Sequence, residues 1–417
     1  MNPLSRLRAL DTFQRHVVAA SFLGWTLDAF DFFLLVMMLP TLARTFAVGV
    51  PAVAVAITLT LAMRPLGALI FGRLADRYGR RPVLMADIVL FSVLAALAAA
   101  STSLVMLLVL RALFGIAMGG EWGLGAALTM ESIPAAARGV VSGLLQEGYA
   151  FGYLLAAAAY FGLFAWIGWR GMFLLGLLPA LLVLYVRRHV PESPVWSAHR
   201  GRVGTQPSGG WRKLVPRFLF LVLLMTAFNF FSHGSQDLYP TFLQQQRHFS
   251  VQQTGLLTMV LNVGAILGGL FFGAMSERIG RRRAIVIAAL LALPAIPLWV
   301  WAPTPLLLGV GAFALQFMVQ GAWGVVPAHI NELSPEGVRG TLPGFAYQTG
   351  NLIAASTAPL LSMLALRQQG DYAAVLAFFV AGVAVLVAVI TALGPEARGA
   401  RFGAAPAHER RRMRDPE

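Results

Sequence analysis

Long runs of apolar residues occupy most of this chain of 417 residues, and each run is close to the length that a helix needs to cross a lipid bilayer. Hydrophobic residues make up 58% of the chain and charged residues only 12%, whereas soluble domains carry about 25% charged residues. We therefore predict an all-α membrane protein with several transmembrane helices. The first run begins near Val17 and continues past Leu39. It is too long for the core of a signal peptide, so we expect it to be retained as a membrane span.

The apolar runs fall into two sets of six when they are counted at about 20 residues per crossing. The first set is predicted at residues 17–43, 50–72, 82–102, 104–131, 139–166 and 168–187. The second set is predicted at residues 217–246, 253–275, 283–302, 304–331, 340–366 and 371–394. We accordingly expect an N-terminal six-helix half over 1–187, a polar central loop over 188–216, a C-terminal six-helix half over 217–394 and a basic tail over 395–417.

The distribution of positive charge indicates the orientation of the chain. All but six of its 32 lysine and arginine residues lie in the termini, the central loop or the even-numbered loops. Because cytoplasmic loops carry an excess of basic residues, we predict that both termini and the central loop are cytoplasmic. The net charge of +14 then reflects loops beside anionic lipid headgroups and requires no nucleic-acid partner. The short termini and the Arg-rich, Lys-poor composition favour a bacterial-type inner membrane.

The two sets of spans are copies of one another at a constant offset of 201 residues. GRLADRYGRRP begins at Gly72 and GAMSERIGRRR begins at Gly273. The same offset relates Trp122 to Trp323 and continues without a gap through the segments ESIPAAARG and ELSPEGVRG. A parallel repeat of six spans is typical of transporters that are built as two halves around a central cavity.

These motifs resemble those of the major facilitator superfamily, and the resemblance covers essentially the whole chain. Gly72 would allow helices to approach closely, and Gly79 could adopt the positive φ that a tight link between two spans requires. The resemblance implies that the acidic residues of ESIPAAARG and ELSPEGVRG pair with loop arginines. Such pairs could form a static clamp, but we favour a latch that opens during transport, because surface ion pairs are each worth only about 1 kcal/mol. The predicted gating residues are Asp76, Arg80, Glu131, Arg138, Glu277, Arg281, Glu332 and Arg339.

Ionisable residues lie near the predicted middle of the first two spans. Span 1 contains Asp28 and Asp31, which are one helical turn apart and share a face, and span 2 contains Arg64. Charges at this depth cost several kcal/mol unless they are paired or hydrated, so they are candidates for function. The three could form a buried structural ion pair, but we prefer an Arg64 that faces a cavity and exchanges between the two acids. Arg111 and Glu121 lie away from the midplane, and we expect them to be mainly structural.

Span 7 carries the largest group of polar residues, in the stretch NFFSHGSQDLYPT. Asn229, His233 and Asp237 follow one another at intervals of four and form one stripe of a helix, with Gln236 beside them. The two amides could simply link helices by hydrogen bonds. His233 and Asp237 could be a satisfied structural pair, but we favour proton handling because histidine titrates near neutral pH.

Spans 5 and 11 add further polar residues. Gln348 and Asn351 lie near the centre of span 11, and Glu147 lies in the inner half of span 5, where its role is left open. A small carboxylate substrate needs a planar donor of two hydrogen bonds, which Arg64 supplies and a lysine would not. Amide and hydroxyl donors could then orient a neighbouring hydroxyl or keto oxygen of that substrate.

The span-7 stretch also resembles, position for position, the signature of the Jen-type monocarboxylate–proton symporters, Asn-x-x-Ser/Thr-His-x-Ser/Thr-Gln-Asp-x-x-x-Thr. GWTLDAFDFF and RPLGALIFGRLADRYGRRP are similar to segments of that family and of the related sialate–proton symporters. The resemblance implies uptake of lactate, pyruvate or a similar monocarboxylate with a proton, by alternating access of two halves. It also implies that functional positions are occupied by Arg64, Asn229, His233, Gln236, Asp237 and Asn351.

Two features bear on the size of the substrate. Sialate carriers often have two additional spans in mid-chain, and the central loop contains no apolar run long enough for them, which favours a smaller substrate. VPESPVW after span 6 resembles loops of sugar porters and aromatic-acid carriers, so a sialate, an aromatic acid or a dicarboxylic acid stays an alternative. We expect substrate binding by Arg64, Asn229, Gln236, Asn351 and Gln348, and proton coupling by Asp28, Asp31, His233 and Asp237.

Other classes of protein are less consistent with the sequence. An enzyme is disfavoured because the chain lacks a Ser-His-Asp order, an HExxH motif and a nucleotide-binding loop. A transporter-like sensor would carry a long signalling tail, whereas the basic tail here is short. With no cysteine, the chain can form neither disulfides nor cysteine metal sites, and we expect no metal and no cofactor. The expected partners are a small carboxylate, a proton and the lipid membrane, with the protein as a monomer.

Overall fold

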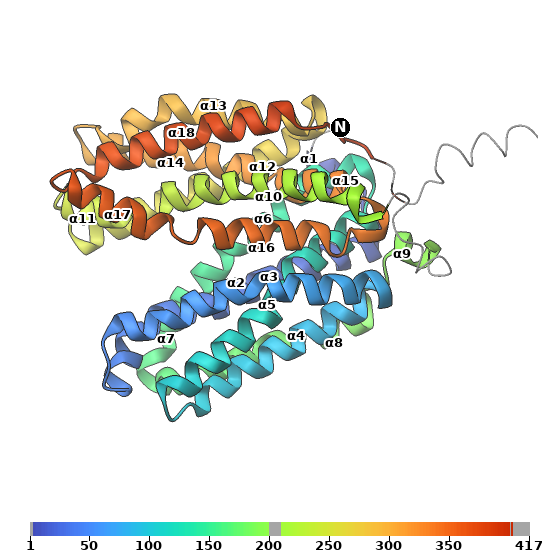
Figure 1. Ribbon diagram of the computed structural model, residues 1–417, viewed down its shortest axis with the longest axis horizontal. Helices are drawn as coiled ribbons and strands as arrows, with labels where there is room; N and C mark the ends of the chain where they lie inside the picture. Colours follow the sequence, from blue (N-terminus) through green and yellow to red (C-terminus); the bar gives the residue numbers. More distant parts are fainter. Residues whose placement is uncertain (1–2, 200–209, 401, 403–417) are drawn as a thin grey trace, which may run out of the picture.

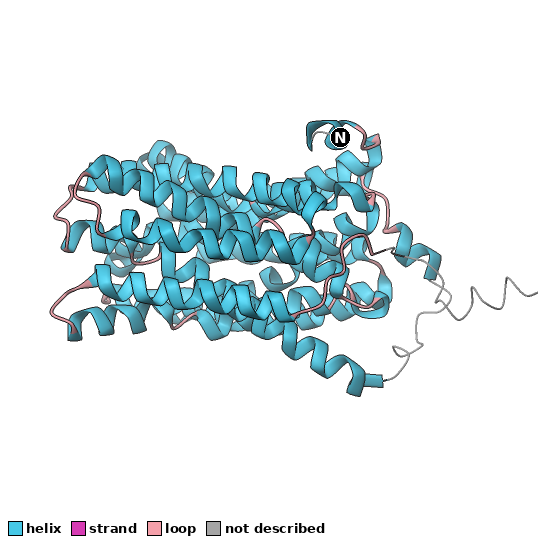
Figure 2. Cartoon of the chain, turned by 90° about the horizontal axis from the view of Figure 1, so that it is seen from above, coloured by secondary structure: helices cyan, strands magenta, loops and turns pink. Residues whose placement is uncertain are grey.

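The computed structural model describes residues 3–199, 210–400 and 402, and every regular element in that part of the chain is a helix (Figure 2). The N-terminal half contains α1 (Pro3–Arg8), α2 (Thr12–Thr45), α3 (Val50–Tyr78), α4 (Arg80–Leu97), η1 (Ala98–Ala100), α5 (Leu104–Ser132), η2 (Ala135–Ala137), α6 (Arg138–Gln146), α7 (Gly148–Leu174), η3 (Leu175–Leu177) and α8 (Leu178–His189). A short helix, α9 (Pro194–His199), follows in the predicted central loop.

The C-terminal half repeats this order. It contains α10 (Gly210–Gln236), α11 (Tyr239–Gln245), α12 (Val251–Ile279), α13 (Arg281–Val300), α14 (Pro305–Trp323), α15 (Val326–Leu333), η5 (Glu336–Val338), α16 (Leu342–Ala354), α17 (Thr357–Arg367) and α18 (Tyr372–Leu393). Residues 200–209 of the predicted central loop and most of the predicted tail, 395–417, lie outside the described residues.

The predicted membrane crossings can be counted on the described helices. Eleven helical stretches there are long and apolar enough to span a membrane. One of them, Ala135–His189, has 55 residues, which is roughly 80 Å of helix against a bilayer core of about 30 Å. It is interrupted at Gly168, which has a φ of 59° and is the first residue of predicted span 6. This stretch therefore supplies two crossings, and the twelve-helix fold in two halves is confirmed.

The two halves lie side by side as two groups of helices (Figure 1). Within the N-terminal half, α3 packs against α5 and α2 against α7; within the C-terminal half, α12 packs against α14 and α13 against α18. The two halves contact each other through α6 with α12 and through α3 with α16. The large buried apolar clusters belong mainly to single halves, so the surface between the halves is left for polar function.

The tight links predicted from the repeated motif are present in both halves. Gly79 joins α3 to α4 with a φ of 109°, and Gly280, at the equivalent position, joins α12 to α13 with a φ of 101°. Residues with a β-carbon rarely adopt this conformation, which explains glycine at both positions. The expectation for Gly79 is confirmed.

Four predicted spans are interrupted near their middle instead of forming single helices. The breaks separate α6 from α7, α10 from α11, α14 from α15 and α16 from α17. The break after α10 falls within the stretch NFFSHGSQDLYPT, just before Pro240. Broken helices expose backbone and side-chain polar groups at the depth where transporters of this architecture bind their substrates.

Candidate functional site

A cavity of about 620 Å³ lies between the two halves. Its walls come from α2, α3, α6 and α7 of the first half and from α10, α11, α12, α14 and α16 of the second. Four of the five predicted substrate-binding residues line it, and so do two of the four predicted proton-coupling residues. They are Arg64, Asn229, Gln236, Asn351, His233 and Asp237.

Arg64 on α3 is the cation that the first half presents to the cavity. Its side chain is 4% exposed, and its Nη2 atom donates to the sulfur of Met118 at 2.6 Å, which is a weak acceptor. The same nitrogen lies 3.9 Å from Oδ2 of Asp28, too far for a hydrogen bond, and Nε is buried without a partner. The guanidinium group therefore keeps hydrogen-bond donors available to an anion in the cavity.

The two acids of span 1 lie behind the cavity wall. Asp28 and Asp31 are both fully buried and are not among the residues that line the cavity. In this state Arg64 lies 3.9 Å from Asp28, and Asp31 interacts electrostatically with Arg111 of α5; exchange of Arg64 between the two acids during transport stays a prediction. The carboxyl oxygens of both acids are buried without hydrogen-bond partners.

His233 forms the predicted pair with Asp237, and it also contacts Asn351 on another helix of the same half. Its Nδ1 atom lies 3.0 Å from Oδ2 of Asp237, and its Nε2 atom lies 3.1 Å from Oδ1 of Asn351 on α16. Through these two contacts the imidazole ring links α10 to α16. The side chains of His233 and Asp237 are 29% and 38% exposed, so water in the cavity reaches both.

The amide residues are placed in different ways. Gln236 donates to Oε1 of Gln316 at 2.8 Å, and Gln316 in turn donates to Oγ of Ser235 at 2.9 Å. Asn229, which lines the cavity, donates to the carbonyl oxygen of Met225 at 2.8 Å within its own helix. Gln348 is 1% exposed and is not among the residues that line the cavity.

Aromatic side chains supply much of the remaining wall. Trp25 and Tyr149 of the first half stack with their ring centroids 5.7 Å apart. Trp323 and Tyr347 of the second half meet edge to face at 5.7 Å. These rings line the cavity together with Phe32, which the guanidinium carbon of Arg64 approaches to 5.5 Å. The site is therefore a mostly apolar cavity with a few polar groups, as small-molecule sites usually are.

The predicted gating residues lie together at one end of the bundle, here called the gate end. Within the first half, Arg80 lies 3.1 Å from Asp76 and 3.2 Å from Glu131. Within the second half, Arg281 lies 2.8 Å from Glu277 and 3.0 Å from Glu332. The acids of ESIPAAARG and ELSPEGVRG thus pair with loop arginines, as the resemblance implied.

The same residues also join the two halves. Arg339 of the second half lies 3.3 Å from Glu131 of the first, and Arg138 of the first lies 3.6 Å from Glu332 of the second. Asp76 accepts hydrogen bonds from the backbone of Gly340 and Thr341, at 2.8 and 3.1 Å. The halves are therefore closed against each other at the gate end.

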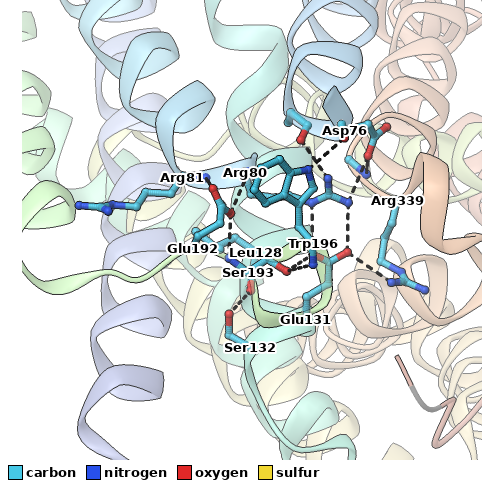
Figure 3. Close-up of polar contacts among 12 residues, drawn as sticks. Asp76, Arg80, Arg81, Leu128, Glu131, Ser132, Glu192, Ser193, Trp196 and Arg339 are labelled. Atoms are coloured by element: carbon cyan, nitrogen blue, oxygen red, sulfur yellow. Dashed lines mark hydrogen bonds and ion pairs between the residues drawn. The ribbon is translucent and has the colours of Figure 1, made fainter. Parts of the chain in front are cut away.

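The segment that contains α9 is built into this cluster (Figure 3). Glu192 accepts hydrogen bonds from the backbone N–H groups of Arg80 and Ser193, at 2.9 and 2.7 Å. The hydroxyl group of Ser193 donates to Glu131 at 2.5 Å, and the indole N–H of Trp196 donates to the carbonyl oxygen of Asp76 at 3.0 Å. The stretch VPESPVW therefore holds the gate loop of the first half in place.

One residue of the tail contacts both halves at this end. The ring of Phe402 lies 3.6 Å from the guanidinium carbon of Arg138 and 3.7 Å from that of Arg339. Arg138 also donates to the carbonyl oxygen of Ala400 at 2.6 Å. Arg138 and Arg339 occupy equivalent positions of the repeat, so the tail meets the molecule where its two copies come together.

Several of these residues escaped the sequence analysis. Gln316 and Gln320 on α14 stand one turn apart in an apolar span, which is the signal that identified span 7 and could have identified them too. Glu192 and Ser193 lie in a motif that was noted only for its resemblance. No such signal marks Phe402. Among the described residues, no group of three or more His, Asp or Glu side chains is arranged to hold a metal ion.

Comparison with known proteins agrees with this architecture. Residues 45–209 match the family model "Sugar (and other) transporter", and residues 237–413 match the model "Major Facilitator Superfamily". The chain is 30% identical to a probable 4-methylmuconolactone transporter of Cupriavidus pinatubonensis, over 82% of each chain. It is 28% identical to a carboxylic acid transporter protein homolog of Saccharomyces cerevisiae, over 95% of this chain and 70% of the relative.

A further relative and a solved structure extend the comparison. The sialic acid transporter NanX of Escherichia coli is 28% identical over 91% of this chain and 94% of its own length. The fold matches that of the proton:xylose symporter XylE bound to 6-bromo-6-deoxy-D-glucose, with a TM-score of 0.75 and 19% identity, over 94% of this chain and 98% of that structure. With two halves related by a sequence repeat, a cavity between them and ion pairs that close one end, the chain belongs to the major facilitator superfamily of membrane transporters.

Proposed function

We propose that this transporter takes up a short monocarboxylate, such as lactate or pyruvate, together with a proton. The observation that carries the proposal is Arg64, a cavity-lining guanidinium group. Among the described residues its one hydrogen bond is to a thioether, and its nearest acid lies 3.9 Å away. A carboxylate that forms two parallel hydrogen bonds with this group would replace weak partners by strong ones. The relatives named for carboxylic acid, 4-methylmuconolactone and sialic acid transport support an organic acid as the cargo.

The second half supplies groups that can hold the rest of the substrate and the proton. When it is protonated, the imidazole ring of His233 adds a second positive charge, which Asp237 partly balances. Asn229 and Asn351 offer amide groups to a 2-hydroxy or 2-keto oxygen, and Gln236 is held in place by Gln316. Because His233 and Asp237 are both reached by cavity water, they can exchange a proton with it while the anion is bound. Gln348, Asp28 and Asp31 do not line the cavity, and they would influence the site indirectly, through the residues that line it.

Transport would follow from alternating closure of the two ends. We propose that the gate end faces the cytoplasm of a bacterial-type inner membrane, with both termini on that side, because the basic loops lie there. The ion pairs Glu131–Arg339 and Arg138–Glu332 would then separate when the transporter opens inward, and the protein would work as a monomer. The halves 1–187 and 217–394 would move as the two rigid units of this cycle.

Uptake by purified protein in liposomes tests the proposal. We expect labelled lactate to accumulate when the outside is more acidic than the inside. Arg64→Lys keeps the charge but loses the two-pronged donor, so the uptake rate should fall at least about tenfold, the equivalent of about 1.4 kcal/mol. Arg44→Lys, an exposed arginine on α2, is the matched control and should transport normally. A near-normal rate for Arg64→Lys would show that Arg64 does not clamp the substrate.

A larger organic acid is a second candidate, and the dimensions of the cavity favour it. About 620 Å³ is in the range of sites for drug-sized ligands, and Trp25, Tyr149, Trp323 and Tyr347 could pack against a ring. A three-carbon acid would share this space with water. Competition against labelled lactate by unlabelled pyruvate, benzoate, muconate and sialate decides between the candidates. If the larger acids compete and pyruvate does not, the smaller substrate is excluded.

A further inference from the structure

A carboxyl group without a partner lies where the cavity meets the contact between the halves. Glu147, at the break between α6 and α7, lines the cavity, yet it is only 4% exposed. Its Oε1 atom is buried without a hydrogen-bond partner. This oxygen is directed at Gly269 of α12 in the other half, so closely that a β-carbon on Gly269 would collide with it.

A contact made of glycines lies directly beside this carboxyl group on its gate side. Gly139 and Gly143 precede Glu147 at intervals of four, so all three share one face of the helical segment. They meet Gly269 and Gly273 of α12, and a β-carbon on Gly143 or Gly273 would collide with the backbone of the other half. These four glycines, here called the glycine seal, bring two backbones into contact between the cavity and the gate end.

The neighbouring charges do not neutralise Glu147. Among the described residues Glu147 forms no ion pair. The main influence on its carboxyl group is its removal from water by burial. The cavity also contains Arg64, His233 and Asp237, whose partners have been described above. The other titratable groups on α6, on α7 and on the helices packed against them are these: Arg6 and Arg8 on α1; Arg15, His16, Asp28, Asp31 and Arg44 on α2; Arg80, Arg81 and Asp87 on α4; Arg111, Glu121 and Glu131 on α5; Arg138 on α6; Tyr149, Tyr153, Tyr160 and Arg170 on α7; Glu277 and Arg278 on α12; none on α14; His329 and Glu332 on α15.

We propose that Glu147 is the group through which a proton controls opening of the gate end. An ionised carboxylate held against a glycine backbone without a partner is costly, so the closed seal favours the neutral acid. When α6 and α12 separate, water from the gate end reaches the carboxyl group and stabilises the ionised form. Loss of the proton therefore favours the open gate, and binding of a proton favours the closed one. This inference rests on the proposed proton coupling and adds a residue to it.

The proton balance of this step is simple. With the gate open, the O–H bond of Glu147 breaks, and the proton passes to water on the gate side. While the gate is closing, a hydronium ion in the cavity water gives a proton to the carboxylate: one O–H bond of the hydronium ion breaks, and the O–H bond of Glu147 forms before the seal is completed. One proton thus crosses the glycine seal for each cycle, without any other reactant.

The repeat supplies a natural model for a carboxyl group that cannot ionise. Gln348 occupies the position equivalent to Glu147, one offset of 201 residues along the chain. It is 1% exposed, and its Oε1 atom is also buried without a partner. A glutamine therefore fits the equivalent environment in the other half, so Glu147→Gln should fold and should behave as a permanently neutral acid.

The test measures opening of the gate directly and needs no substrate. Ser142 on α6 is fully buried and accepts a hydrogen bond from the backbone N–H of Ala328 in the other half, at 3.0 Å. Because the natural chain has no cysteine, Ser142→Cys provides a single thiol that a maleimide reaches only when the halves separate. Labelling rates of purified protein at pH 6 and pH 8 are divided by those of the unfolded protein, which removes the intrinsic reactivity of the thiol.

We expect the corrected rate for Ser142→Cys to be at least about fivefold higher at pH 8 than at pH 6, because one titrating group can change an equilibrium by up to about tenfold per pH unit. Adding Glu147→Gln should reduce this ratio to below about twofold. Glu121→Gln removes another buried and unpartnered carboxyl group, which lies on α5 of the same half, and serves as the matched control that keeps the ratio. An unchanged ratio in Glu147→Gln, or its loss in Glu121→Gln, would overturn the assignment.

Transport by Glu147→Gln separates this inference from the proposed function. In liposomes, the variant should still exchange labelled for unlabelled substrate, but it should no longer accumulate substrate against its gradient in response to pH. If the unmodified protein transports no carboxylate while its gate still opens with rising pH through Glu147, the proposed substrate fails and the inference stands. If proton-driven accumulation is normal in Glu147→Gln, the inference fails and the proposed function stands.

Discussion

At the scale of single residues, the cavity brings together one arginine and one histidine–aspartate pair. Arg64 approaches from the first half, and His233 with Asp237 faces it from the second. Sequence spacing predicted the His233–Asp237 pair because positions i and i+4 of a helix are neighbours wherever the helix lies. Spacing could not predict that Asp31 interacts electrostatically with Arg111, because that depends on how α2 and α5 are rotated against each other.

The His233–Asp237 pair leads to a prediction about coupling. His233→Ala or Asp237→Asn should reduce accumulation driven by a pH gradient at least about tenfold but keep much of the exchange between saturating substrate on both sides. Exchange uses only the loaded states, whereas net symport must return the empty carrier, which is costly with an uncompensated charge in the cavity. Both activities are measured with labelled lactate in the same liposomes.

Asp31→Asn is the comparison for this experiment, since Asp31 is the competing proton site. If it uncouples transport while both span-7 variants accumulate substrate normally, the proton passes through span 1. His233 and Asp237 would then only line the cavity.

At the scale of helices, close contact between backbones decides how the gate end closes. Gly123 of α5 lies so near α16 that a β-carbon on it would stand 2.8 Å from Cα of Gly344. The repeated motifs predicted such approaches for Gly72, and a β-carbon there would indeed lie 2.6 Å from Cα of Thr341. The breaks in the four interrupted spans were not predicted, because hydropathy averaged over about 20 residues does not register a local loss of helical geometry.

The contact at Gly123 gives a prediction about the gate. Gly123→Ala should hold the two halves apart and raise the labelling rate of Ser142→Cys at least about threefold, because the added methyl group cannot fit beside Gly344. Gly382→Ala is the matched control, since a β-carbon there meets nothing within 4 Å. Both changes raise helix propensity by about 1 kcal/mol, so a difference between them reports the contact. Equal labelling of the two variants would mean that Gly123 does not limit closure.

At the scale of the whole molecule, the internal repeat explains both what the sequence could predict and where that prediction stops. The offset of 201 residues matched the pairs Arg80–Glu131 and Arg281–Glu332, and both form as the motif implied. The repeat cannot predict the role of a segment that has no copy in the other half. The tail is such a segment. Phe402 has no counterpart in the first half, yet its ring contacts the equivalent arginines of both halves.

The contact of Phe402 with the two arginines leads to a last prediction, which concerns the equilibrium between the open and the closed gate end. Phe402→Ala removes two interactions between a ring and a cation, each worth about 0.5–2 kcal/mol, and leaves Arg138 and Arg339 as like charges without the ring. Because those arginines also form the ion pairs that join the halves, the closed gate end should become less stable. The labelling rate of Ser142→Cys should rise about threefold or more.

Phe402→Tyr, the conservative variant, tests whether the aromatic ring or another part of the tail stabilises the closed gate end. Phe402→Tyr keeps an aromatic face beside both guanidinium groups, so its gate should open no more often than that of the unmodified protein. A rise in Phe402→Ala alone therefore identifies the ring as the element that stabilises closure. If Phe402→Ala labels at the unmodified rate, the ion pairs Glu131–Arg339 and Arg138–Glu332 hold the gate end without help from the tail, and the two halves alone set the balance between the states.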